Sequence, residues 1–199
     1  MLLPVPPTPQ PQSLDDLLAQ AAHYAEYSMS KFGRLTPALF LIGADGQLLM
    51  FVPDSLADDA AKDDFATTAR LVCIAHDAAA CVMVLEALAK FATPGEKLDV
   101  SEPPSEAFDR REVVVLMGES RETQRQKFLP ILRSGNGRFF GFGEPDALAM
   151  GGMQGRFAQI LPPKVPDEAT REVVHAMLKV KGIAKAKSVG GPLRSRPRF

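Results

Sequence analysis

The chain has 199 residues, of which 46% are apolar and 24% are charged, and its formal net charge is −1. This composition is typical of a soluble globular domain with its own core, and the small net charge excludes a strong general attraction to nucleic acid or membrane. The start MLLPVPPTPQPQ lacks a basic n-region, and no apolar run approaches about 20 residues. We therefore expect no signal peptide, no membrane span and a cytoplasmic location.

Residues 1–12 include five prolines and predict an extended arm. A helix is predicted next, because Ser13 is a good N-cap, apolar residues recur at helical spacing over 14–29, and Gly33 ends the run. The runs ALFLIG and QLLMFV, joined by Ala-Asp-Gly, predict a hairpin. Both runs are apolar on successive residues, which indicates strands buried on both faces.

One long helix is predicted from about Asp63 to Ala92, and it contains both cysteines of the chain. Cys73 and Cys81 fall on its apolar face, so we expect core cysteines rather than metal ligands or nucleophiles. A metal site would need further ligands that converge with the nearby His76, and none is evident. We therefore predict neither a metal nor a cofactor.

The same predicted helix carries Arg70 and Asp77 on its apolar stripe, either as an ion pair or with Arg70 reaching solvent. Its opposite side is also poor in charge and carries a candidate dimer surface, made of Val72, Ala75, Ala79 and Met83. Such a surface is covered either by another protein or within the chain. We expect a homodimer about a two-fold axis beside this helix. The alternative is that the first helix or the Gly/Met segment near residue 150 covers it.

The polar segment after the predicted helix contains the densest ionisable cluster. Its candidate functional residues are Glu106, Asp109, Arg110 and Arg111. Carboxylates and arginines on a loop that leads into a strand are compatible with a hydrolase site, and the alternative is a solvated connection whose charges pair locally. No nucleophile or partner histidine accompanies them, so we predict no catalytic residue.

Three further strands, EVVVLMGE, QKFLPILR and GRFFGFG, and a helix over about 167–181 complete the domain. Pro130 cannot donate to a ladder, so its strand is expected at an edge or at a bulge. The order predicts an α+β fold over residues 13–181, with one antiparallel sheet of about five strands flanked by helices. It resembles the layout of roadblock-type and profilin-like α/β/α sandwiches, a likeness of element order from which no function follows.

Residues 182–199 are predicted to be a flexible basic tail. After Glu172 the chain has no acidic residue. The tail's candidate nucleic-acid contacts are Lys185, Lys187, Arg194, Arg196 and Arg198, interleaved with Gly, Pro and Ser. Such a sequence suits phosphate backbones, and the alternative is a basic end that binds nothing specific.

We therefore expect a non-enzymatic interaction or accessory protein of bacterial type, which binds a protein partner or a second copy of itself. The alternatives are a nucleic-acid-associated protein that uses the basic tail and a hydrolase that uses the loop at 102–112.

Overall fold

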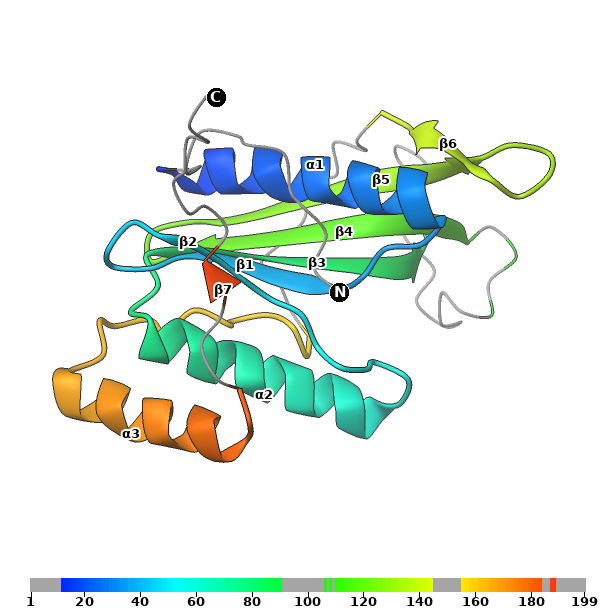
Figure 1. Cartoon of the computed structure of the whole chain (residues 1–199). Coiled ribbons are helices and arrows are strands. Elements are labelled where there is room, and N and C mark those ends of the chain that lie inside the picture. The colour runs from blue at the N-terminus through cyan, green and yellow to red at the C-terminus, as the bar shows by residue number, and fades with distance from the viewer. Residues whose placement is uncertain are drawn as a thin grey trace, which may run out of the picture.

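The computed structural model of the chain shows an antiparallel sheet with helices on both faces (Figure 1). It describes residues 12–90, 106, 108, 110–144, 155–183 and 187–188. In chain order the elements are α1 (Leu14–Phe32), β1 (Ala38–Ile42), β2 (Leu48–Phe51), α2 (Asp59–Ala75), β3 (Ala80–Ala89), β4 (Arg111–Ser120), β5 (Gln124–Arg133), β6 (Phe139–Phe142), α3 (Glu168–Val180) and β7 (Lys187–Ser188).

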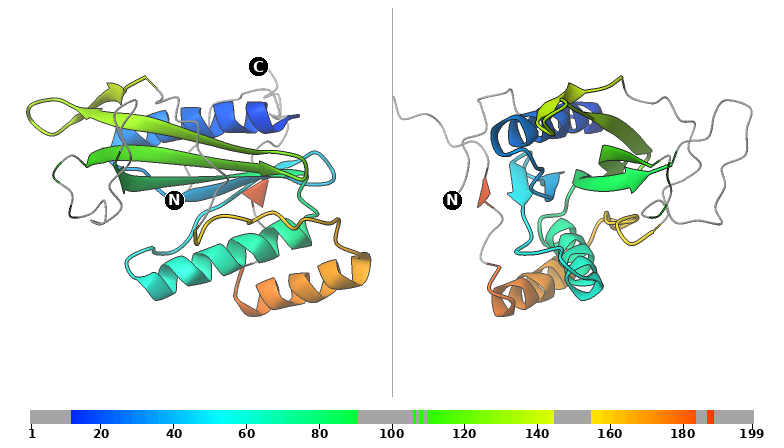
Figure 2. Two further views of the ribbon diagram at one scale, coloured as in Figure 1. Left: turned by 180° about the vertical axis from the view of Figure 1, so that it is seen from behind. Right: turned by 90° about the vertical axis from the view of Figure 1, so that its right-hand side faces the viewer.

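The sheet confirms the predicted α+β class. Within the described ranges it has seven strands, in the order β6-β5-β4-β3-β1-β2-β7, and every neighbouring pair is antiparallel. The strand count exceeds the prediction of about five, because β3 was taken for helix and the two-residue β7 was not expected. Helices cover both faces, so the three-layer arrangement also agrees with the prediction (Figure 2).

Helix α1 begins and ends where the sequence predicts. The Ser13 Oγ accepts a hydrogen bond from the Asp16 N at 3.1 Å, and the Asp16 Oδ2 accepts one from the Ser13 N at 3.1 Å, which completes a capping box. Gly33 closes the helix with a φ of 70°, a conformation that glycine adopts without strain. The apolar side of α1 packs on β3 and β4.

The long helix predicted from about Asp63 to Ala92 is wrong in its second half. Helix α2 stops at Ala75, and β3 follows as a central strand between β1 and β4. Asp77 makes the turn between them with a φ of 43°, a left-handed conformation that aspartate tolerates better than most residues. The run ACVMVL is apolar at every position, so a buried helix and a buried strand give the same pattern there.

Helices cover both faces of the sheet (Figures 1 and 2), and each face carries its own hydrophobic core. The first core lies under α1, and the second lies between the sheet and α2, to which α3 adds Val174 and Leu178. Cys73 from α2 and Cys81 from β3 belong to the second core, with exposed fractions of 0% and 1%. The prediction that both cysteines are core residues is confirmed.

The four residues of the predicted dimer surface do not lie on one helix. Val72 and Ala75 lie on α2 and Met83 lies on β3, and all three are buried in the second core. Ala79 is exposed just before β3 begins. The four residues therefore share no outer helix face, and for three of them the cover is internal to the chain.

Of the two alternatives predicted for the strand that contains Pro130, an edge position is wrong, and an irregular pairing is present. Strand β5 lies between β4 and β6, and its pairing with β6 shifts register between Leu132 and Arg133. The Pro130 carbonyl accepts a hydrogen bond from the Gly143 N at 2.8 Å. Because the N and O of one strand residue point to the same side, the missing donor of Pro130 faces the end of β6 and leaves the pairing with β4 intact.

Two residues of the segment predicted to be a flexible tail add a strand to the sheet. Lys187 and Ser188 form β7, which pairs with Met50 and Leu49 of β2. Among the described helices, none combines the length and the hydrophobicity needed to cross a bilayer.

Candidate functional site

An irregular segment, residues 155–163, runs beside α2 on the same face of the sheet (Figure 1). We call this segment the strap. Its residues Ala158, Ile160 and Leu161 are buried, although they belong to no helix or strand. A buried segment without regular structure still needs partners for its backbone N–H and C=O groups. Charged side chains from α2 and β4 provide several of them.

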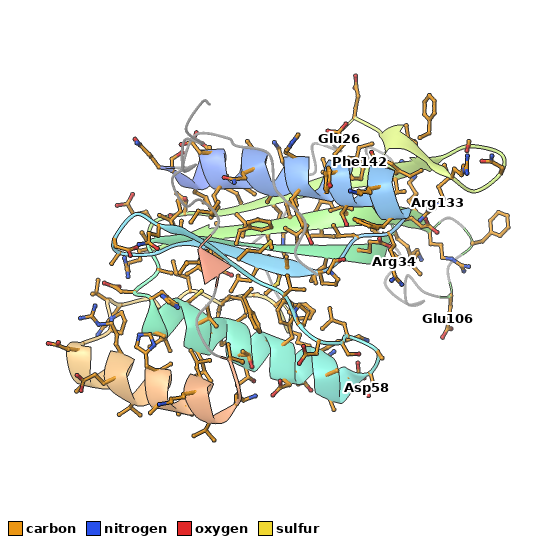
Figure 3. All side chains as sticks on the ribbon, in the orientation of Figure 1. Glu26, Arg34, Asp58, Glu106, Arg133 and Phe142 are labelled. Atoms are coloured by element: carbon orange, nitrogen blue, oxygen red, sulfur yellow. The ribbon has the colours of Figure 1, made fainter. Side chains whose placement is uncertain are left out.

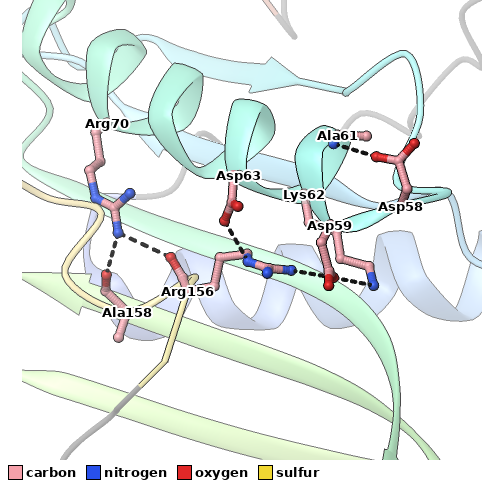
Figure 4. Close-up of polar contacts among 8 residues, drawn as sticks. All are labelled: Asp58, Asp59, Ala61, Lys62, Asp63, Arg70, Arg156 and Ala158. Carbon is pink, nitrogen blue, oxygen red and sulfur yellow. Dashed lines mark hydrogen bonds and ion pairs between the residues drawn. The ribbon is translucent and has the colours of Figure 1, made fainter.

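The side chain of Arg70, on α2, donates hydrogen bonds to main-chain carbonyls of the strap. Its Nη2 donates to the Arg156 carbonyl at 3.0 Å and to the Ala158 carbonyl at 3.1 Å (Figure 4). Its Nε donates to the carbonyl of Gln159 at 3.3 Å. Neither position predicted for Arg70 is therefore correct, because it neither pairs with Asp77 nor extends freely into solvent.

A second arginine ties the start of the strap to the first turns of α2. The Arg156 Nη1 lies 3.0 Å from the Asp59 Oδ1, and its Nε lies 2.6 Å from the Asp63 Oδ1 (Figure 4). The hydrogen bond from Arg156 is the largest of the effects that lower the pKa of the Asp59 carboxyl. Both acids are largely exposed, so these ion pairs position the strap more than they stabilise the fold.

Glu119, near the end of β4, holds the strap from the sheet side. Its cross-strand neighbour Cys81 belongs to the second core, so the Glu119 side chain points to the same face. The side chain is 3% exposed, and its Oε2 accepts a hydrogen bond from the Leu161 N at 3.0 Å. In the described part of the chain its Oε1 has no hydrogen-bond partner. A buried carboxylate oxygen without a donor is costly, and such atoms mark places where a donor is expected.

Glu119 lines a pocket with a volume of about 870 Å³. Its walls come from three parts of the chain: Arg70 and Ile74 of α2, residues 119–124 where β4 turns into β5, and residues 159–163 of the strap. Small-molecule sites typically have volumes of about 300–1,000 Å³. The apolar part of the wall consists of Ile74, Ile160, Leu161, Pro162 and Pro163.

Hydrogen bonds hold the rim of this pocket in place. The Ser120 N donates to the Thr123 carbonyl at 2.8 Å, and the two hydroxyl oxygens lie 3.1 Å apart. The Arg121 Nη2 donates to the Asp77 Oδ1 at 2.7 Å, and these side chains are 28% and 16% exposed. The rim is therefore connected to the turn between α2 and β3, and the pocket is largely formed before any ligand arrives.

The two cysteines lie close to Glu119 in the second core. A hydrogen bond with the Cys73 thiol, followed by burial and the nearby Glu119 carboxylate, raises the pKa of the Cys81 thiol well above its usual range. Because the thiolate is the nucleophilic form, this environment disfavours a reactive cysteine.

None of the described residues of the loop predicted as a candidate site lines the pocket. Glu106, Arg110 and Arg111 are exposed, and Asp109 lies outside the described residues. Strand β4 begins at Arg111, eight residues before Glu119, which corresponds to about 26 Å along a strand.

The labelled side chains of Figure 3 place Glu106 within the molecule. Glu106 lies at the end of the molecule that also holds Arg34 and Arg133. Arg133 ends β5, whereas the pocket lies where β5 begins.

The predicted nucleic-acid contacts are not tested by the structure. Lys185, Arg194, Arg196 and Arg198 lie outside the described residues, and Lys187 is placed only as a backbone position of β7. Across the described ranges, no three His, Cys, Asp or Glu side chains come together as metal ligands would.

Sequence reasoning missed Glu119, because the run EVVVLMGE predicts a strand without singling out its last residue. The alternation of residues along the strand did contain a signal for Glu119. Residues 113, 115, 117 and 119 share one face of a strand, and three of them are apolar. A charged residue that continues a buried face is unusual.

Comparison with known proteins gives no relative: no protein-family model, no curated protein and no solved structure matches the chain. The likeness to roadblock-type and profilin-like layouts concerned the predicted element order, and the observed order has two further strands, β3 and β7.

Proposed function

We propose that this protein is a non-enzymatic accessory protein that acts by binding a ligand in the pocket beside the strap. The observation that carries the proposal is the Oε1 of Glu119, which is buried in the wall of a pocket of ligand size and has no hydrogen-bond partner among the described residues. A wall that served only packing would favour an apolar residue or a fully bonded charge at this position. A carboxylate with one open acceptor suits a site that receives a donor from outside.

The residues around the pocket support binding more than catalysis. Among the described residues that line it, none is a histidine or a cysteine. The hydroxyls of Ser120 and Thr123 contact each other instead of a general base, which a hydroxyl nucleophile needs for activation. The hydrolase and nucleic-acid alternatives remain predictions, because no contact of the described residues favours either.

The test is a ligand screen read by NMR on the full chain. Amide shifts of the ¹⁵N-labelled protein are recorded against a library of small charged and amphipathic compounds. Hits should perturb the amides of residues 119–124 and 159–161 together, since these are the residues of two pocket walls that carry a backbone N–H.

Glu119→Gln is the informative variant for this screen. The glutamine carbonyl can still accept from the Leu161 N, so the strap keeps its anchor, while the amide places a donor where the open acceptor was. Glu122→Gln, an exposed acid of the same wall, is the matched control. The hits should be lost in the first variant and kept in the second. The proposed function is contradicted if the hits perturb residues outside the pocket. It is also contradicted if they bind Glu119→Gln as tightly as the parent protein.

A further inference from the structure

Two opposite charges line this pocket, and each is held by the main chain of the strap. The Glu119 carboxylate accepts from the Leu161 N, and the Arg70 guanidinium donates to the carbonyls of residues 156, 158 and 159. Within the described residues neither group forms an ion pair. By contrast, Arg121 on the same wall is neutralised by Asp77. Of the four charged residues in the pocket wall, Glu119 and Arg70 thus hold the strap without an ion pair among the described residues, whereas the remaining charge, Glu122, is exposed to solvent.

We infer that the pocket takes a zwitterionic ligand of the amino-acid or short-peptide type, an inference that rests on the proposed function. The ligand's ammonium donates to the Oε1 of Glu119, and its carboxylate faces Arg70. An ammonium satisfies the open acceptor and neutralises the buried charge at once, whereas a neutral N–H donor would leave that charge uncompensated. Guanidinium groups are likewise well suited to carboxylates.

The remaining wall fits the body of such a ligand. Ile74, Ile160 and two prolines supply apolar surface, which favours aliphatic side chains between the charged ends. A pocket of about 870 Å³ lies in the range of sites that hold drug-sized molecules. This volume favours a short peptide over a single small amino acid, and the two sources differ only in length.

The test uses leucyl-leucine in four forms: free, N-acetylated, C-terminally amidated, and blocked at both ends. Isothermal titration calorimetry on the full chain gives Kd for each, and free leucine serves as the shorter ligand. The free dipeptide should bind most tightly. Blocking either end should weaken binding by about tenfold or more, because one charge-assisted contact is lost. Because the change is made on the ligand, this comparison needs no variant that could fail to fold.

A thermodynamic cycle that combines Glu119→Gln with N-acetylation of the dipeptide tests whether Glu119 binds the ligand's ammonium. The variant should weaken the free dipeptide by about tenfold or more and leave the already weak N-acetyl form unchanged, so that the two changes are not additive. Equal binding of the free and N-acetylated dipeptides overturns the zwitterion inference, and so does full additivity. If library compounds bind at residues 119–124 while no dipeptide does, the inference fails and the proposed function stands. If nothing binds there, both fail.

Discussion

Gly118 of β4 lies where the sheet packs closely against α1. It is buried on β4, and a Cβ built there would lie 3.1 Å from the Leu14 Cδ1 and 3.2 Å from the Leu18 Cδ2. Carbon atoms in favourable contact are about 3.5–4.0 Å apart. Gly118→Ala therefore requires the Leu14 and Leu18 side chains to give way by a few tenths of an ångström.

The expected effect is a net loss of stability. Overpacking of a tight core costs about 1–3 kcal/mol, and replacing glycine within a strand returns about 0.5–1 kcal/mol. We expect Gly118→Ala to lower the free energy of unfolding by up to about 2.5 kcal/mol, measured by urea titration with far-ultraviolet circular dichroism. Gly141→Ala is the matched control, because a Cβ there meets no atom within 4 Å. It should be neutral or slightly stabilising.

A second substitution tests whether the clash is the cause. Leu18 is buried, so Leu18→Ala alone should cost about 2–5 kcal/mol. In the double variant the added methyl enters the space that the leucine leaves, and the combined loss should be smaller than the sum of the two single losses. A Gly118→Ala protein as stable as Gly141→Ala, or additive losses with Leu18→Ala, would refute the close approach of α1 to β4.

Two further predictions concern the cysteines and the histidine that follows α2. Burial and the raised pKa of Cys81 should let an aromatic disulfide reagent modify the thiols only through unfolding, and Cys73→Ala or Cys81→Ala should each cost on the order of 1 kcal/mol; rapid modification of the native protein would contradict this. Burial, then the charge of His175, lowers the pKa of His76 below 6.5, while Asp45 opposes the shift. The unfolded chain therefore binds this proton more tightly, and stability should fall as the pH drops from about 6.5 toward the lowered pKa. His76→Gln should reduce this pH dependence of the free energy of unfolding, measured by urea titration at several pH values. An unchanged pH dependence would show that other groups cause it.

The sequence predicted those elements whose ends carry local signals. Helix α1 has Ser13 and Gly33 at its two ends, and the hairpin of β1 and β2 has Gly46 in its turn. Such signals act between residues close in sequence, so one chain is enough to interpret them. The turn after α2 has neither glycine nor proline. Asp77 occupies the left-handed conformation there instead, and the strand that follows is buried at its first six residues. Nothing local distinguished the end of that helix from its continuation.

The candidate site could not be predicted for a different reason. Its three walls come from residues 70–74, 119–124 and 159–163, which are distant in sequence and carry no shared motif. The cluster that the sequence did favour, around Glu106, was dense in charge, and its described residues are exposed. Density of charge along the chain is the usual property of a solvated segment. One charge on a buried strand face is rarer, and it becomes informative only when the strap that covers it is known.

Glu119 and Arg70 serve the fold and the pocket at the same time, and this decides which substitutions are informative. Each anchors the strap through backbone groups, so truncation would leave a buried amide or carbonyl without a partner, at a cost of about 1–3 kcal/mol. A lost ligand in Glu119→Ala would therefore be ambiguous, since the strap could have moved. Glu119→Gln keeps an acceptor for the Leu161 N and changes the charge and the second oxygen. Only an isosteric change of this kind separates the role of Glu119 in recognition from its role in holding the strap.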